Sequence, residues 1–170
     1  MVLTLRQKLK TLVGASNSDE VIFTFNGTDS LNLAIHGHLR PGDHVITTTA
    51  EHNSVLRPLR HLEDRNLIEV SRVTCDDHGR VSAAAIQAEL RPSTKLVAVI
   101  HTSNVTGASN LIQEIGAVVK ESSAMLLVDA AQSVGQQHID FTKWNVDMLA
   151  FPGHKSLFGP LGTGCLIVNE

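Results

Sequence analysis

The chain has few residues of the kinds that stabilise small extracellular folds or bind nucleic acids. Only two of its 170 residues are cysteine, Cys75 and Cys165, and they lack the spacing of metal ligands. Two thiols make no disulfide framework in a chain of this size, so a reducing compartment fits best and no metal site is expected. The 14 basic and 17 acidic side chains give a net charge of 14 − 17 = −3, without a long run of either sign. A nucleic-acid partner is therefore not expected.

Long hydrophobic runs are also absent. No stretch approaches the roughly 18 consecutive apolar residues of a membrane span. Residues 1–10 alternate charge with leucine, unlike a signal peptide. We therefore expect a cytoplasmic protein without a membrane partner. The sequence has no internal repeat, low-complexity segment or linker, so residues 1–170 are expected to form one compact unit, either a whole domain or part of a larger one.

Short apolar segments alternate with amphipathic ones along the chain. Runs of strand length occur at residues 21–25, 44–48, 68–73, 96–101, 125–129, 147–151 and 165–168. Apolar residues at helical spacing occur at residues 29–39, 54–65, 82–90 and 111–121. The run Leu96-Val97-Ala98-Val99-Ile100 has no polar face, which predicts a strand covered by helices on both sides.

This pattern predicts the α/β class: a three-layer α/β/α fold around a mostly parallel central sheet of about seven strands. In such sheets, ligands bind outside the carboxyl ends of the strands, where connecting loops can be polar without disturbing the core. The residues that follow each predicted strand are therefore the place to look for chemistry.

Polar clusters follow several of the predicted strands. Asn26-Gly27-Thr28-Asp29 directly precedes a helix, so free backbone N–H groups and the helix dipole favour an anion there. The alternative, which this segment alone favours, is that Thr28 caps the helix. Two further clusters do not indicate a functional site when each is considered alone: Glu51-His52-Asn53-Ser54 and His101-Thr102-Ser103-Asn104. A histidine at a strand end is often a surface residue, and Ser54 can start a helix.

Two charged residues give sharper signals. The apolar run 125–128 ends in Asp129, whose buried carboxylate needs a cationic partner or access to water, unless it merely caps a helix. Lys155 follows the next strand in a loop with three later glycines that can approach a ligand closely. A partly desolvated lysine is a nucleophile toward carbonyls, although a solvent-facing loop lysine is more common. Five polar clusters at one sheet edge together outweigh the separate alternatives.

These clusters resemble a family: the class V, fold-type-I pyridoxal-phosphate enzymes, and among them the cysteine desulfurases and selenocysteine lyases. The resemblance covers nearly the whole chain and depends on five motifs in a fixed order. They are Asn26-Gly27-Thr28-Asp29-Ser30-Leu31-Asn32, Glu51-His52-Asn53-Ser54, His101-Thr102-Ser103-Asn104-Val105-Thr106-Gly107, Val128-Asp129-Ala130-Ala131-Gln132 and Gly153-His154-Lys155. The set is far more specific than any one member.

The resemblance implies a role for each matching residue. Lys155 holds pyridoxal 5'-phosphate as a Schiff base and moves the α-proton of the substrate, while His52 stacks on the cofactor ring. Asp129 pairs with the pyridinium nitrogen. Gln132 contacts the phenolic oxygen of the cofactor. The phosphate is bound by Thr28, by the N–H groups at Gly27 and by His154. Asn104 binds the substrate carboxylate. The implied partners are a cysteine-like amino acid, a second copy of the chain in a homodimer and a sulfur-acceptor protein.

The chain also departs from the family pattern. Pro152 stands where many relatives have a serine, and family members are more than twice as long. The resemblance places Met1 near a helix that follows an N-terminal segment. It places the carboxylate-binding arginine, the sulfur-accepting cysteine and a smaller C-terminal domain beyond residue 170, so neither Cys75 nor Cys165 receives that role. Residues 1–170 are thus expected to be part of the large domain of a cysteine desulfurase. The alternatives are a class V aminotransferase and an inactive, truncated cofactor-binding domain.

Overall fold

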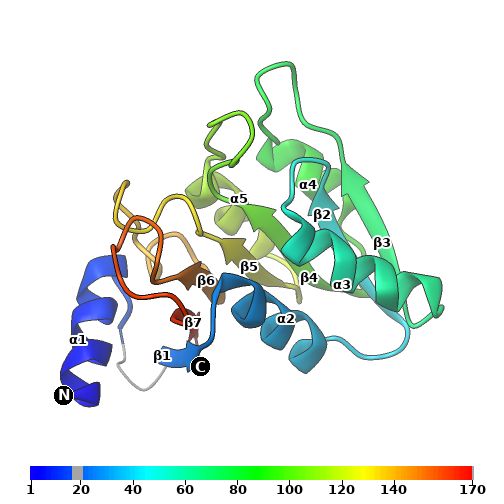
Figure 1. Cartoon of the computed structure of the whole chain (residues 1–170). Helices are drawn as coiled ribbons and strands as arrows, with labels where there is room; N and C mark the ends of the chain where they lie inside the picture. Colours follow the sequence, from blue (N-terminus) through cyan, green and yellow to red (C-terminus); the bar gives the residue numbers. More distant parts are fainter. Residues whose placement is uncertain (17–20, 170) are drawn as a thin grey trace.

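One sheet of seven strands forms the centre of the protein in the residues that the computed structural model describes, 1–16 and 21–169 (Figure 1). The strands are β1 (Val21–Thr24), β2 (Asp43–Thr48), β3 (Ile68–Val73), β4 (Thr94–Ile100), β5 (Met125–Asp129), β6 (Met148–Pro152) and β7 (Gly164–Val168). They lie in the order β1-β7-β6-β5-β4-β2-β3. Only β7 runs antiparallel to its neighbours, so the other six strands share one direction. The predicted, mostly parallel sheet is confirmed.

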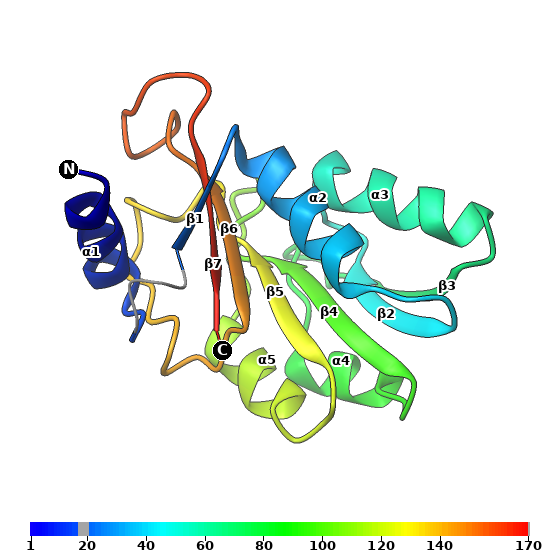
Figure 2. The same cartoon turned by 90° about the horizontal axis from the view of Figure 1, so that it is seen from below.

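Helices cover both faces of the sheet (Figure 2). They are α1 (Val2–Val13), α2 (Gly27–His38), α3 (Asn53–Asp64), α4 (Ala83–Glu89) and α5 (Ile112–Val119). Helices α2 and α3 lie on one face, and α4 and α5 lie on the other. In the described ranges, no helix is long and apolar enough to cross a membrane.

The β4 strand shows why a wholly apolar run was predicted to lie between two layers. Val97 and Val99 belong to the hydrophobic core under α4 and α5, whereas Leu96 and Ala98 belong to the core under α2 and α3. Successive strand residues point to opposite faces, so both faces of this strand are buried. The three-layer prediction is confirmed.

Helix α1 is the element that the apolar pattern did not predict. Its only buried residue is Val13, while Leu3, Leu5 and Leu12 stay exposed. A helix with so little of its surface buried shows no clear apolar stripe in its sequence. It ends at Gly14, whose φ of 67° gives the left-handed conformation that glycine adopts readily at a helix C-terminus.

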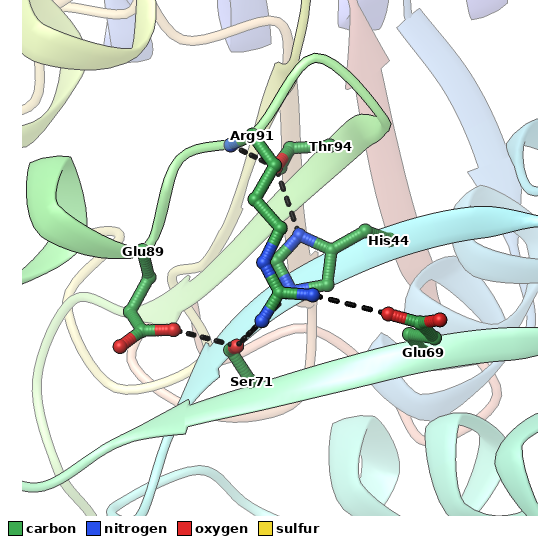
Figure 3. A network of polar contacts seen from close by, with 6 residues as sticks. All are labelled: His44, Glu69, Ser71, Glu89, Arg91 and Thr94. Carbon is green, nitrogen blue, oxygen red and sulfur yellow. Dashed lines mark hydrogen bonds and ion pairs between the residues drawn. The ribbon is translucent and has the colours of Figure 1, made fainter.

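A network of polar side chains lies toward the amino ends of β2 and β4 (Figure 3). We call it the amino-edge network, and it consists of His44, Glu69, Ser71, Glu89, Arg91 and Thr94. The imidazole of His44 is buried, with Nδ1 at 2.8 Å from the Thr94 hydroxyl and Nε2 at 3.1 Å from the Ser71 hydroxyl.

The two hydroxyl partners of His44 determine which of its ring nitrogens carries the proton. The Ser71 hydroxyl donates to Glu89 at 2.7 Å, so its oxygen is left to accept from Nε2–H of His44. Thr94 accepts the backbone N–H of Arg91 at 2.8 Å, so its hydroxyl can donate to Nδ1. His44 is therefore held as one neutral tautomer.

Candidate active site

A cavity of about 350 Å³ opens at the carboxyl edge of the sheet, where the parallel strands end. All eight residues predicted to form the site line it: Gly27, Thr28, His52, Asn104, Asp129, Gln132, His154 and Lys155. They follow strands β1, β2, β4, β5 and β6, which share one direction. The loops that follow parallel strands lie at the same edge of the sheet. For this reason Gly27 and Lys155, which are 128 positions apart in the sequence, line the same cavity.

The N-terminus of α2 forms one wall of this cavity. Asn26, not Thr28, is the N-cap, because its side chain accepts the backbone N–H of Asp29 at 2.8 Å. The interpretation of Thr28 as the cap is therefore wrong. The Thr28 hydroxyl instead lies 2.7 Å from that of Ser54, and the first N–H groups of the helix, at Gly27 and Thr28, have no acceptor within the described residues. An anion can bind there.

Gly27 brings this helix close to the end of β6. A Cβ atom at position 27 would lie 3.1 Å from the ring of Pro152. Pro152 thus packs against the helix N-terminus and presents no hydroxyl to the cavity. The anion-binding groups on this side are the backbone N–H groups and the Thr28 hydroxyl.

His52 is oriented by its own helix. Its Nδ1 accepts the backbone N–H of Ser54 at 3.1 Å and lies 2.8 Å from the Ser54 hydroxyl, so His52 caps α3. Ser54 lies inside the helix, and the interpretation of Ser54 as its start is wrong. Because Nδ1 is an acceptor, the proton of the neutral ring is on Nε2. The ring is fixed at the cavity wall.

Asp129 is a buried carboxyl group on the cavity floor, with 3% of its surface exposed. Its Oδ1 accepts the Ala131 N–H at 2.9 Å in a turn, so the alternative of a helix cap is wrong. Burial raises the pKa of this carboxyl, and the Ala131 hydrogen bond and the charges of Lys155 and His52 oppose that rise. The carboxyl is suited to pairing with a cationic ligand atom, which would favour its ionised form.

Lys155 lies in a tight loop between β6 and β7. The Phe158 N–H donates to the Lys155 carbonyl at 2.9 Å, and the Gly159 N–H donates to the Gly153 carbonyl at 2.8 Å. These bonds fix the backbone while the lysine side chain remains exposed at the cavity. In the neighbouring His154, Nδ1 is buried without a hydrogen-bond partner in the described part of the chain. That atom is available to a ligand.

The cavity thus combines three kinds of group: an anion-binding helix N-terminus, a buried carboxyl and a primary amine. This set matches a ligand with a phosphate, a basic ring nitrogen and an aldehyde, so the residues present fit pyridoxal phosphate. A metal ion has no comparable set, because residues 1–16 and 21–169 contain no group of three or more His, Cys, Asp or Glu side chains arranged to hold one.

The two cysteines differ in their exposure. Cys165 is buried in β7, and burial raises the pKa of its thiol to about 12, so it is an unreactive core residue. Cys75 is partly exposed and precedes the turn at Asp77 and His78.

Sequence reasoning missed the structural roles of Asn26 and Glu51. Asn26 was recognised only as part of a motif, although asparagine before a helix is a common cap. Glu51 is buried behind the cavity. No sequence signal distinguishes it from an exposed glutamate, because glutamate is rarely buried.

Comparison with known families gives a match over the whole chain. The family model of Aminotransferase class-V matches residues 1–170. A probable cysteine desulfurase of Pyrococcus abyssi is 41% identical over 155 residues, which are 89% of this chain and 38% of that protein.

Solved structures give the same result. The apo cysteine desulfurase from Thermococcus onnurineus has a TM-score of 0.91 and 34% identity, over 99% of this chain and 42% of that one. A structure of SspA in complex with cysteine has a TM-score of 0.92 and 33% identity, over 98% of this chain and 48% of that one. The chain therefore spans less than half the length of these proteins.

Proposed function

Because the chain belongs to the Aminotransferase class-V family, we propose that it forms the cofactor-binding part of a pyridoxal-phosphate-dependent cysteine desulfurase. Such an enzyme converts L-cysteine to alanine and releases the sulfur. The observation that carries this proposal is that all eight predicted residues line one cavity. The desulfurase names of the relatives and the cysteine in the SspA complex support a cysteine-like substrate.

The cavity residues would hold the cofactor at three points. Thr28, the N–H groups at Gly27 and His154 bind the phosphate, while Gln132 donates to the phenolic oxygen. Asp129 pairs with the ring nitrogen and keeps it protonated, and His52 covers the ring face. When bound, pyridoxal phosphate supplies an electron sink for the α-carbon of an amino acid.

Lys155 has two tasks in this proposal. Its amine would hold the cofactor through the aldehyde group, and the same amine would move the proton at the substrate α-carbon. Exposure of the Lys155 side chain at the cavity supports both tasks, because the amine must reach the cofactor and then the substrate. Asn104, on the loop after β4, holds the substrate carboxylate.

The partners and the setting of the whole protein are part of the proposal. We propose a cytoplasmic homodimer that passes sulfur to an acceptor protein, with residues 1–170 as part of its large domain. Coverage of 38% to 48% of the relatives' length supports the last point. Phe25 after β1, and Phe158 and Leu161 in the loop between β6 and β7, are exposed, and exposed apolar side chains of this size favour association.

The test is a titration of the chain with pyridoxal phosphate, followed by visible absorbance. Wild type and the control Lys143→Ala, which changes an exposed lysine outside the cavity, are expected to give a saturable band that Lys155→Ala lacks. Equal bands in all three proteins would contradict the proposal.

The reaction is then tested by product analysis with the loaded chain. Alanine from L-cysteine, with the sulfur recovered as sulfide when dithiothreitol is present as the reductant, identifies a desulfurase, and preference for L-selenocysteine identifies a selenocysteine lyase. A keto acid identifies a class V aminotransferase, and a band without any product identifies a cofactor-binding domain that is inactive alone.

A further inference from the structure

Glu51 is a buried carboxyl group to which the proposed reaction assigns no task. It lies in the loop between β2 and α3, directly before His52, with 6% of its surface exposed. Its Oε1 accepts the Thr48 hydroxyl at 2.6 Å and the backbone N–H of Ile100 at 2.9 Å. Its Oε2 is buried without a hydrogen-bond partner in the described residues.

The two hydrogen bonds of Oε1 join two segments that backbone pairing leaves unconnected. The β2–β4 pairing ends at Thr47 and Ala98, so the N–H of Ile100 at the end of β4 has no partner on β2 and uses Glu51 instead. The next residue, His101, donates its backbone N–H to the Asp129 carbonyl at 2.9 Å. Glu51 therefore connects the loop that contains His52 to the strand end that pairs with Asp129.

The environment of Glu51 favours its uncharged form. Burial is the main cause that raises the pKa of this carboxyl to about 8, and the nearby Asp129 charge adds to the rise, while the hydrogen bonds from Thr48 and Ile100 oppose it. Because Oε1 already accepts two hydrogen bonds, the proton of the neutral acid belongs on Oε2. Ionisation would place a second buried negative charge close to Asp129.

We propose that Glu51 is a positioning residue of the cofactor site, whose carboxyl group holds the His52 loop against the end of β4 through the two hydrogen bonds that Oε1 accepts. It touches no substrate or cofactor itself, since it does not line the cavity. The relevance of Glu51 to catalysis rests on the proposed function. Its connection between the His52 loop and the end of β4 does not depend on that function.

The titration has a defined direction. The charged and polar groups around the carboxyl are Asp129 from β5, the Thr48 hydroxyl from β2 and the Ile100 amide from β4. Because burial raises the pKa of this carboxyl to about 8, a chain in which the His52 loop has opened to water releases the proton at lower pH than the closed one. The closed arrangement therefore loses stability as the pH rises toward 8, and loses no more above it. The His52 loop is then held less firmly.

The test uses the 170-residue chain without cofactor, so that it stands apart from cofactor binding. Amide hydrogen exchange at Ile100, expressed as a protection factor, and the ring signals of His52 are followed by NMR from pH 6 to pH 9. The variants are Glu51→Gln, which keeps the Oε1 acceptor without a charge, and Glu51→Ala, which removes it. The matched control is Glu121→Gln, at an exposed glutamate.

We expect Glu51→Ala to lower the Ile100 protection factor about tenfold, and Glu51→Gln to restore it, since one buried hydrogen bond has that size of effect. In wild type and in Glu121→Gln, the protection factor should fall as the pH rises from 6 and level off near pH 8, and the His52 signals should shift near pH 8. In Glu51→Gln both changes should be absent. An unchanged protection factor in Glu51→Ala, or the same pH profile in Glu51→Gln and wild type, would overturn the inference. If Glu51→Ala does not fold, the pH profile of Glu51→Gln decides alone.

Discussion

The two edges of the sheet differ in how many of their buried polar atoms have hydrogen-bond partners. In the amino-edge network, both ring nitrogens of His44 have hydroxyl partners, and those hydroxyls are satisfied in turn (Figure 3). At the carboxyl edge, three buried atoms lack partners in the described residues: Glu51 Oε2, His101 Nδ1 and His154 Nδ1. An unpaired buried polar group costs about 1–3 kcal/mol of stability. The amino edge thus contributes stability, whereas the carboxyl edge loses some of it, and of the three residues with an unpaired atom only His154 lines the cavity.

The largest effect is expected at the amino edge. His44→Ala should lower the free energy of unfolding by about 3 kcal/mol, because it opens a cavity and leaves the buried Thr94 hydroxyl without the acceptor for its proton. Urea denaturation measures the loss. Affinity for pyridoxal phosphate should stay within about twofold of wild type, since the network lies far from the cavity. A parallel loss of affinity would show that the two edges are not independent.

His101 provides the corresponding experiment at the carboxyl edge. Its ring packs edge-on against Trp144 at 5.4 Å, and burial lowers its pKa from 6.5 to about 4. As the pH falls below 6.5, the unfolded chain takes up a proton first, so the folded state loses stability until about pH 4. His101→Phe should remove about 2 kcal/mol of this acid sensitivity. Denaturation at pH 7 and pH 4 measures it, and equal losses in both proteins would assign the sensitivity to other groups.

A smaller effect with opposite signs for stability and binding is expected at Asp129. Its raised pKa means that the unfolded chain releases this proton first as the pH rises, so wild type loses stability between the unfolded and the folded pKa values. Asp129→Asn should be more stable than wild type at pH 7 and bind pyridoxal phosphate about tenfold more weakly. Thermal unfolding and absorbance titration give the two values. A variant that is both less stable and equally good at binding would refute this assignment.

The smallest effect is expected on a surface outside both edges. Arg60 and Asp64 form an ion pair of 2.7 Å on α3, with side chains 67% and 56% exposed. Such pairs contribute little, so Arg60→Ala should change the free energy of unfolding by less than about 0.5 kcal/mol and leave cofactor binding unchanged. It serves as the baseline in the same denaturation series.

Most of the fold could be predicted because buried parallel strands have continuous apolar runs. The runs at 44–48 and 96–101 correspond to β2 and β4 within two residues at each end. The antiparallel direction of β7 could not be predicted, because an apolar run is compatible with a parallel or an antiparallel strand. Its position depends on a contact distant in sequence: Gly164 lies so close to Asn26 that a Cβ atom there would be 2.5 Å from the Asn26 carbonyl carbon.

The candidate site could be predicted only to the level of which loops meet. The parallel strands bring Thr28, His52, Asp129 and Lys155 together, as expected. The capping residues were assigned wrongly, because a cap is chosen by backbone geometry: Asn26 has extended backbone angles that place its side chain over the helix end. Histidine is also an uncommon cap, so nothing in the segment favours His52 over Ser54 as the cap of α3.

The most direct test of the account is the location of the covalent bond between the chain and pyridoxal phosphate. The loaded chain is reduced with borohydride, digested and analysed by peptide mass spectrometry. The account predicts one phosphopyridoxyl group, on the peptide that contains Lys155, and none in Lys155→Ala at the same cofactor concentration. Label spread over the surface lysines, or equal label in Lys155→Ala, would contradict the claim that the carboxyl edge of this sheet is a cofactor site.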